Sequence, residues 1–310
     1  MFFPAGCFNS LTVKTIGIGA DLLYVLNAGG PGICAIRPNI TGFSVNAAGQ
    51  MEFTGSQRAI SAGPSSATSG VSCLAESETG FHDLTGAPAS DFACGLNPPS
   101  FARSPAQVGF TPAGNRLVVT VKGTNKIYVF PVDANGVVDK PETTQAPGPA
   151  LPTYFGFTFD KKANLLVAEL FGTATSIPAG GQGAVSSFAK AGDLAPISSD
   201  VGDEGTAAIT IALEPTAGKF AYVANNLSAS VSSYTVGTNG SVTLLAATAA
   251  PISGPNDLAT AAEGGASFLY VVEGGSGTVG AFQINLTTGS LSSLTSGSGL
   301  TSTAQGLAAF

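Results

Sequence analysis

Short apolar runs alternate with turn-forming residues along the whole chain, and the runs have the length of β-strands. Examples are LVVTV at 117–121 and VTLL at 242–245, while VSSY at 231–234 has two polar residues between apolar ends. Turns such as PAGN at 112–115 and PTAG at 215–218 separate the runs, and Asn-Gly pairs at 135–136 and 239–240 favour hairpins. No segment has a helical period. The pattern therefore predicts an all-β chain.

The pattern also repeats itself. FAYVANNLSASVSSYTVGTNGSVTLL begins at Phe220, and FLYVVEGGSGTVGAFQINLTTGSLSSL begins at Phe268. The equivalent residues Tyr222 and Tyr270 set a period of about 48 residues, which is typical of propeller blades. Weaker copies begin at Asp21, Arg116 and Asn164.

The repeat predicts one β-propeller domain over 1–310, made of four-stranded blades. Five complete blades are expected at about 9–62, 102–148, 153–200, 206–252 and 256–300, with a terminal strand at 303–310. A β-sandwich with accidental repetition is the alternative. An insertion at about 63–101 holds Cys73 and Cys94, which we expect to form a disulfide; the alternative is a decorative loop without regular structure.

Composition narrows the class of protein. Net charge is −7 and only 12 Lys and Arg are spread over the chain, so there is no basic cluster to bind nucleic acid. No apolar stretch reaches the roughly 18 residues that span a bilayer. Charged residues are only 10% of the chain, the Cys count is even, and sequons occur at Asn39, Asn226, Asn239 and Asn285. These features favour a secreted protein, although no intact signal peptide is visible at the N-terminus.

The repeats resemble the lactonase family of seven-bladed propellers, which includes 6-phosphogluconolactonase-like and 3-carboxy-cis,cis-muconate cyclase-like proteins, and they also look like YVTN-type repeats. The stretches that carry the resemblance are LLYVLNAGG, PAQVGFTPAGNRLVVTVKGTNKIYVF, FGFTFDKKANLLVAELFG, FAYVANNLSASVSSYTV and FLYVVEGGSGTVGAF. The resemblance implies seven blades where five are counted, so we expect a chain shortened at its N-terminus; the alternative is that five blades close on their own. Open blade edges would then allow self-association.

Propeller ligands bind where the loops before first strands and after second strands meet around the axis. The repeat places Arg103 and Asp257 in the first set of loops, and Lys122, Glu169 and Glu273 at the ends of second strands. These five residues are the candidate catalytic groups, because carboxylates near a cation can transfer protons. They could equally hold a divalent cation such as calcium, or cap strand ends and bind water, in which case no cofactor is involved.

Two functions follow. The first is a lactonase-like enzyme that hydrolyses or forms a small-molecule lactone by acid/base catalysis in the axial funnel. The second is a non-catalytic secreted propeller that binds a protein, a glycan or a surface. The single histidine, His82, lies in the insertion rather than in a repeat, and no complete catalytic motif is present. Whether the chain is an enzyme stays open at the level of sequence.

Overall fold

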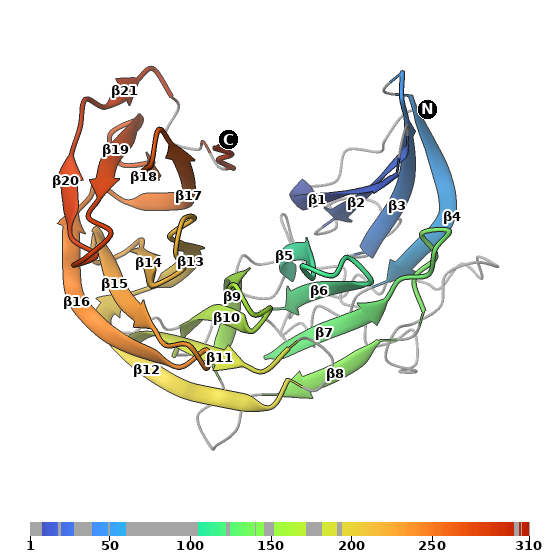
Figure 1. Ribbon diagram of the computed structural model, residues 1–310, viewed down its shortest axis with the longest axis horizontal. Coiled ribbons are helices and arrows are strands. Elements are labelled where there is room, and N and C mark those ends of the chain that lie inside the picture. The colour runs from blue at the N-terminus through green and yellow to red at the C-terminus, as the bar shows by residue number, and fades with distance from the viewer. Residues whose placement is uncertain are drawn as a thin grey trace, which may run out of the picture. The chain divides into compact units, whose positions relative to one another are not determined.

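The structure is a computed structural model, and every regular element among the residues it describes is a β-strand (Figure 1). Among these residues no helix is long and apolar enough to cross a membrane. The described residues are 8–17, 20–27, 39–48, 50–59, 105–121, 125–139, 141–145, 152–171, 182–190, 194–300, 304 and 306–309.

The chain divides into two compact units, Met1–Ala146 and Pro147–Phe310. The first unit holds two four-stranded antiparallel sheets whose strands follow chain order. The strands are β1 (Phe8–Gly17), β2 (Ala20–Asn27), β3 (Asn39–Asn46) and β4 (Met51–Ala59), then β5 (Pro105–Phe110), β6 (Arg116–Val121), β7 (Lys126–Pro131) and β8 (Glu142–Gln145).

The second unit holds three further antiparallel sheets, two of four strands and one of five. Its strands are β9 (Thr153–Phe159), β10 (Leu165–Leu170), β11 (Gln182–Phe188), β12 (Pro196–Thr206), β13 (Ala208–Leu213), β14 (Phe220–Asn225), β15 (Ser230–Val236), β16 (Val242–Pro251), β17 (Pro255–Glu263), β18 (Ala266–Glu273), β19 (Thr278–Ile284), β20 (Leu291–Ser293) and β21 (Gly297–Ser298). Strand β21 pairs with β19 in place of a longer fourth strand.

Turn chemistry explains why each sheet folds back on itself. Asp133 accepts hydrogen bonds from the backbone N–H groups of Asn135 and Val137 in the turn after β7. Asn285 accepts the equivalent bonds from Thr287 and Thr288 after β19. A glycine completes each turn with a positive φ, Gly136 (75°) after β7 and Gly289 (73°) after β19.

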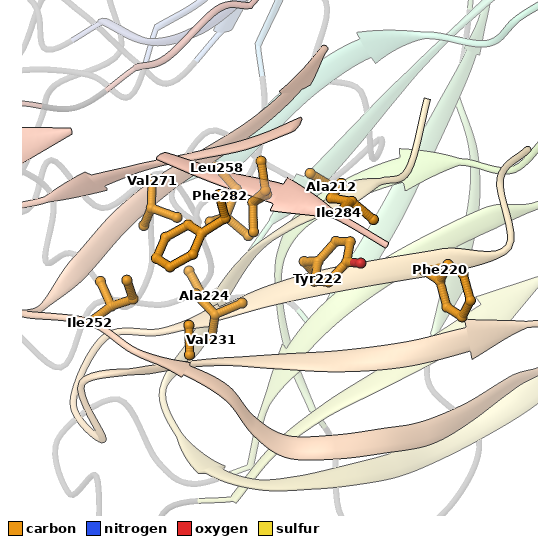
Figure 2. Packing of buried hydrophobic residues seen from close by; sticks show 12 residues of the cluster. Ala212, Phe220, Tyr222, Ala224, Val231, Ile252, Leu258, Val271, Phe282 and Ile284 are labelled. Carbon is orange, nitrogen blue, oxygen red and sulfur yellow. The ribbon is translucent and has the colours of Figure 1, made fainter. Parts of the chain in front are cut away.

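The core lies between neighbouring sheets. Every residue of the second strands β10 and β14 is buried, since these strands are covered on both faces. In the second unit, one seam packs Leu166 and Ala168 of β10 against Ala221 and Val223 of β14. The next seam packs β14 against β17, β18 and β19 through residues that include Tyr222, Leu258, Val271 and Phe282 (Figure 2).

Tyrosine hydroxyls also form hydrogen bonds between neighbouring sheets. Tyr222 donates a 2.8 Å hydrogen bond to the Gly289 carbonyl of the next sheet. In the first unit, Tyr24 donates to the carbonyl of Gly136, which occupies the equivalent turn of its own neighbouring sheet. Within the second unit the first strands also meet, because β13 lies against both β9 and β17. These first strands therefore form the inner side of the three sheets.

The predicted all-β propeller with five four-stranded blades is confirmed, and the blades begin and end within a few residues of the expected positions. One boundary needs correction, because β12 continues to Thr206, past the expected end of its blade at residue 200. The segment expected as a terminal strand is described at 304 and 306–309, where it has no regular secondary structure. The insertion at 63–101, with Cys73 and Cys94, lies outside the described residues. One domain over 1–310 stays a prediction.

Candidate functional site

A row of polar side chains crosses one face of the β9–β12 sheet, one residue from each strand. Tyr154 of β9 pairs with Glu169 of β10, and Ser186 of β11 pairs with Val167, two residues from Glu169 on the same face. The fourth member is Asp200 of β12, whose backbone N–H donates a 2.9 Å hydrogen bond to the Ser186 hydroxyl. The row therefore runs from the inner strand to the outer strand of the blade.

Bulges in β12 set the position of Asp200. Ser187 pairs with Ser198 and Val185 with Val201, so the outer strand carries one more residue than its neighbour in this interval. Asp200 adopts a positive φ of 54°, which is uncommon for a residue other than glycine. A bulge of this kind re-aims a side chain, and bulges occur often beside active sites.

Glu169 is a fully buried carboxyl group with unusual surroundings. Neither of its carboxylate oxygens makes a hydrogen bond of ordinary geometry with the described residues. Burial raises the pKa of Glu169 to about 8; the Ser186 hydroxyl acts in the opposite direction, and the Asp200 carboxyl adds to the increase. Glu169 is consequently an acid that gains and loses its proton near neutral pH.

The two ends of the row differ in exposure. Asp200 is exposed, and desolvation raises its pKa while its interaction with Glu169 lowers it. Tyr154 is buried, and its hydroxyl makes no hydrogen bond within the described part of the chain. Burial is the main cause that raises the pKa of Tyr154, with the carboxylates of Glu169 and Asp200 contributing, so Tyr154 keeps its proton at all ordinary pH values.

A second buried carboxyl group, Asp203, lies three residues further along β12. It accepts hydrogen bonds from the Gly205 N–H (2.7 Å) and the Ser232 hydroxyl (3.2 Å), and Asn225 donates to Ser232 at 3.2 Å. Burial raises the pKa of Asp203, and these bonds lower it. With its oxygens engaged in this way, Asp203 holds β12 to β14 and β15 rather than offering a free carboxylate.

Asp257, at the start of β17, anchors the C-terminal segment. One of its oxygens accepts from the Thr210 hydroxyl (3.3 Å) and the Leu258 N–H (2.8 Å), and the other accepts from the Leu307 N–H (2.9 Å). Burial raises the pKa of Asp257, and the hydrogen bonds oppose that increase. The neighbouring Asn256 donates to the Ala304 carbonyl at 3.2 Å, so two adjacent side chains hold the same segment.

Glu273, at the end of β18, shapes a turn. One of its oxygens accepts from the Ser276 hydroxyl at 3.3 Å and from the Ser253 N–H at 3.4 Å. The expected residues Glu169, Asp257 and Glu273 thus lie on two different sheets, and each has its own surroundings. Lys122 and Arg103 lie outside the described residues, as does His82.

Sequence reasoning missed Asp200 and Ser186, although it identified Glu169. The acidic stretch SSDVGDEG at 198–205 was the available signal. A bulge changes which face each residue takes, and the sequence pattern does not reveal the bulge. Among the described residues, no three His, Cys, Asp or Glu side chains form a group that could hold a metal ion.

Five antiparallel meanders, packed through repeated apolar seams within each unit, define the class of this protein, a β-propeller. A family model, described as Lactonase, 7-bladed beta-propeller, matches residues 95–303. That match covers more than half of the chain, and the chain belongs to this family. None of the curated proteins compared with the chain is similar to it in sequence.

Solved structures agree with this assignment at the level of fold. The periplasmic gluconolactonase PpgL of Pseudomonas aeruginosa is 17% identical with a TM-score of 0.59, and the alignment covers 94% of this chain and 72% of that one. A Bacteroides uniformis protein, described as a candidate 6-phosphogluconolactonase, is 13% identical with a TM-score of 0.58, covering 94% and 72%. At such identities the likeness concerns the fold alone.

Proposed function

We propose that the protein is a lactonase-like enzyme that hydrolyses a small-molecule lactone, or forms one in the reverse direction, with Glu169 as the proton-transferring group. The observation that carries the proposal is Glu169 itself, a fully buried carboxyl group whose pKa is about 8 and whose oxygens make no hydrogen bond of ordinary geometry with the described residues. A general acid/base works best when its pKa lies near the working pH. Membership of the lactonase family supports the class of reaction.

The proposed chemistry balances without a cofactor. A water oxygen forms a bond to the lactone carbonyl carbon, and its proton passes to the Glu169 carboxylate. The bond between that carbon and the ring oxygen then breaks, and the same proton passes to the departing alkoxide oxygen. The product is an open-chain hydroxy acid, and ring closure uses the same groups in reverse. Calcium binding by the carboxylates, and a secreted location, stay predictions that this reaction does not require.

A panel of small-molecule lactones tests the proposal, with Glu169→Gln as the variant and Glu263→Gln as the control. Glu263 is an exposed carboxylate at the end of β17 in the same unit. We expect Glu169→Gln to lower kcat by at least about 100-fold, the lower range for a positioned acid/base group, with little change for the control. Turnover by Glu169→Gln equal to that of the wild type would remove Glu169 from the reaction. Binding of ligands without any turnover by the wild type would favour the non-catalytic alternative.

A further inference from the structure

In the reaction proposed above, Glu169 passes the proton of the attacking water on to the alkoxide oxygen and ends as a carboxylate. The proton that the product acid then loses passes to this carboxylate, which must release it before the next cycle. At neutral pH the hydroxy-acid product ionises, because a carboxylic acid of this kind has a pKa of roughly 4. One proton per turnover must therefore reach solvent. Glu169 is fully buried, whereas Asp200, at the outer end of the same polar row, is exposed.

We propose that the Ser186 hydroxyl and the Asp200 carboxyl form a proton path from Glu169 to solvent across one face of the β9–β12 sheet. The path deepens the function proposed above and rests on it. Its three members come from successive strands, β10, β11 and β12. Register places Glu169 and Ser186 on one face. Asp200 reaches them from the bulge, through its N–H to Ser186 and through its carboxyl group to Glu169. The path therefore crosses the sheet from its buried second strand to its exposed outer strand.

The hydrogen bond at Ser186 orients the path. The Asp200 N–H donates to the Ser186 oxygen at 2.9 Å, so one acceptor position of this hydroxyl is occupied. The hydroxyl proton is then left to point at a carboxylate oxygen, and a hydroxyl that both donates and accepts can pass a proton along. The bulge that gives Asp200 its positive φ of 54° brings both its N–H and its carboxyl group to this point.

The other titratable groups near Glu169 do not offer an exit. Tyr154 on β9 is buried and holds its proton firmly. Tyr234 on β15 is buried, and its hydroxyl donates to the Val201 carbonyl at 3.0 Å. Asp203 on β12 is buried and accepts from Gly205 and Ser232. Among these described groups, Asp200 alone is exposed.

Hydrogen–deuterium exchange of the Glu169 carboxyl proton tests the path without relying on turnover. At pH 6 the carboxyl is protonated, and its infrared carbonyl band is identified as the one that Glu169→Gln removes. After transfer to D2O, we expect the band to shift about 100-fold more slowly in Ser186→Ala and Asp200→Asn than in the wild type. Ser186→Thr keeps a hydroxyl and should exchange at nearly the wild-type rate.

Two controls lie on the same strand as Asp200. Ser199→Ala and Glu204→Gln alter exposed neighbours outside the polar row and should leave the exchange rate unchanged. Wild-type exchange rates in both Ser186→Ala and Asp200→Asn would overturn the path. Slow exchange in Ser186→Ala and Asp200→Asn, together with no turnover of any lactone by the wild type, would support the path and reject the proposed reaction. A failure of the path is therefore distinguishable from a failure of the proposed function.

A separate observation concerns the sequons. Asn226 is followed by Leu-Ser and Asn285 by Leu-Thr, so the two sites are almost identical in sequence. Their surroundings differ. The Asn226 amide nitrogen donates to the Pro255 carbonyl at 3.1 Å and to the Asn256 side-chain oxygen at 3.0 Å, which engages both of its hydrogens.

The turn sequons leave the amide nitrogen accessible. Asn285 is exposed in the turn after β19, and its side chain is held through its oxygen, by the N–H groups of Thr287 and Thr288. Asn239 is exposed in the equivalent turn after β15, and its oxygen accepts from the Ser241 N–H (3.1 Å) and hydroxyl (2.8 Å). We infer that Asn239 and Asn285 are N-glycan acceptors in a eukaryotic secretory pathway and that Asn226 is not.

Secretion of the full chain from a eukaryotic host tests this assignment. Release of glycans by an amidase in heavy-oxygen water converts each modified Asn to labelled Asp, which peptide mass spectrometry locates. We expect label at residues 239 and 285 and none at 226, with one glycan fewer in each of Asn239→Gln and Asn285→Gln and no change in Asn226→Gln. Label at 226, or at neither turn, would overturn the assignment.

Discussion

At the scale of single residues, one tyrosine hydroxyl stabilises a whole seam between sheets. Tyr222 is buried and donates to the Gly289 carbonyl, and replacing it with Phe leaves that carbonyl without its donor. We expect Tyr222→Phe to lower the free energy of unfolding by about 1 kcal/mol, because a buried acceptor then lacks a partner. Chemical denaturation measures the change. Tyr270→Phe, at the equivalent but partly exposed position of the next blade, is the control and should change stability by less than about 0.5 kcal/mol.

The buried carboxyl group of Glu169 makes stability depend on pH. Its pKa rises from 4.5 in the unfolded chain to about 8 in the folded protein, so the folded state holds a proton that the unfolded state has lost. Stability therefore falls as pH rises between these values, by on the order of 1 kcal/mol per pH unit, and changes little outside them. Urea denaturation from pH 5 to pH 9 should show the decline.

Glu169→Gln separates this effect from other titrations. The raised pKa values of Asp200, Asp203 and Asp257 act in the same direction as that of Glu169. Glu214 acts in the opposite direction. Desolvation raises its pKa, but the hydrogen bonds that it accepts together outweigh desolvation and lower the pKa; the donors are Ala217, Thr216, Ser267 and Gly218. The stability that Glu214 contributes is therefore lost as pH falls. In Glu169→Gln, the dependence of stability on pH that comes from these other groups should remain, and the steep decline above pH 5 should be lost. An equally steep decline in the variant would show that Glu169 is not its source.

At the scale of elements, the bulged strand β12 depends on a glycine in its neighbour. A Cβ atom on Gly183 would lie 2.7 Å from one Asp203 carboxylate oxygen and 2.8 Å from the Ala208 Cβ. Asp203 cannot move aside, since Gly205 and Ser232 hold it. We expect Gly183→Ala to cost roughly 1–3 kcal/mol, as overpacking does in a dense core. Thermal unfolding measures the loss.

Gly202 is the matched control on β12 itself. A Cβ atom there has no neighbour within 4 Å. Gly202→Ala should therefore leave stability within about 0.5 kcal/mol of the wild type. If Gly183→Ala and Gly202→Ala lost stability equally, the loss would come from the backbone conformation that glycine allows, and contact with Asp203 would not be its cause.

How far the sequence predicts each element follows from the physics of strands. Second strands such as β14 are buried on both faces, so they appear as continuous apolar runs and their limits are predictable. Turns are predictable from Asp133 or Asn285 followed by glycine. The outer strand β12 is different, because its burial alternates irregularly and its bulges depend on contacts with β11. Glu169 was therefore predictable from its place at a strand end, whereas its neighbour Asp200 was not.

At the scale of the whole molecule, the repeat made the propeller and its blade limits predictable, but it did not predict how the blades use their polar residues. Equivalent positions at the ends of second strands hold Glu169, Asn225 and Glu273. In the structure the first is buried without a hydrogen bond of ordinary geometry to the described residues, the second binds Ser232, and the third shapes a turn. Sequence equivalence thus fixes where a residue lies in its blade, while the neighbouring strands decide its chemistry.

The C-terminal segment provides the last prediction, since Asp257 links it to the start of β17. Asp257→Ala removes the acceptor for the Leu307 N–H and for the Thr210 hydroxyl. We expect amide exchange at 306–309 to become at least about tenfold faster, corresponding to roughly 1.4 kcal/mol of lost local stability. Amide exchange in the rest of the second unit should change little. Exchange measured by mass spectrometry reports both regions at once, and Glu263→Gln on the same strand is the control.

The same variant distinguishes two roles for Asp257. Asn256→Ala removes the hydrogen bond to the Ala304 carbonyl. If Asp257 only holds the segment, Asn256→Ala should loosen the segment in the same way as Asp257→Ala. Both variants should then retain kcat on any lactone that the wild type hydrolyses. If Asp257 transfers protons, its variant should lose kcat while Asn256→Ala keeps it. Because the Asp257 oxygens already accept three hydrogen bonds, from Thr210, Leu258 and Leu307, we expect the first result.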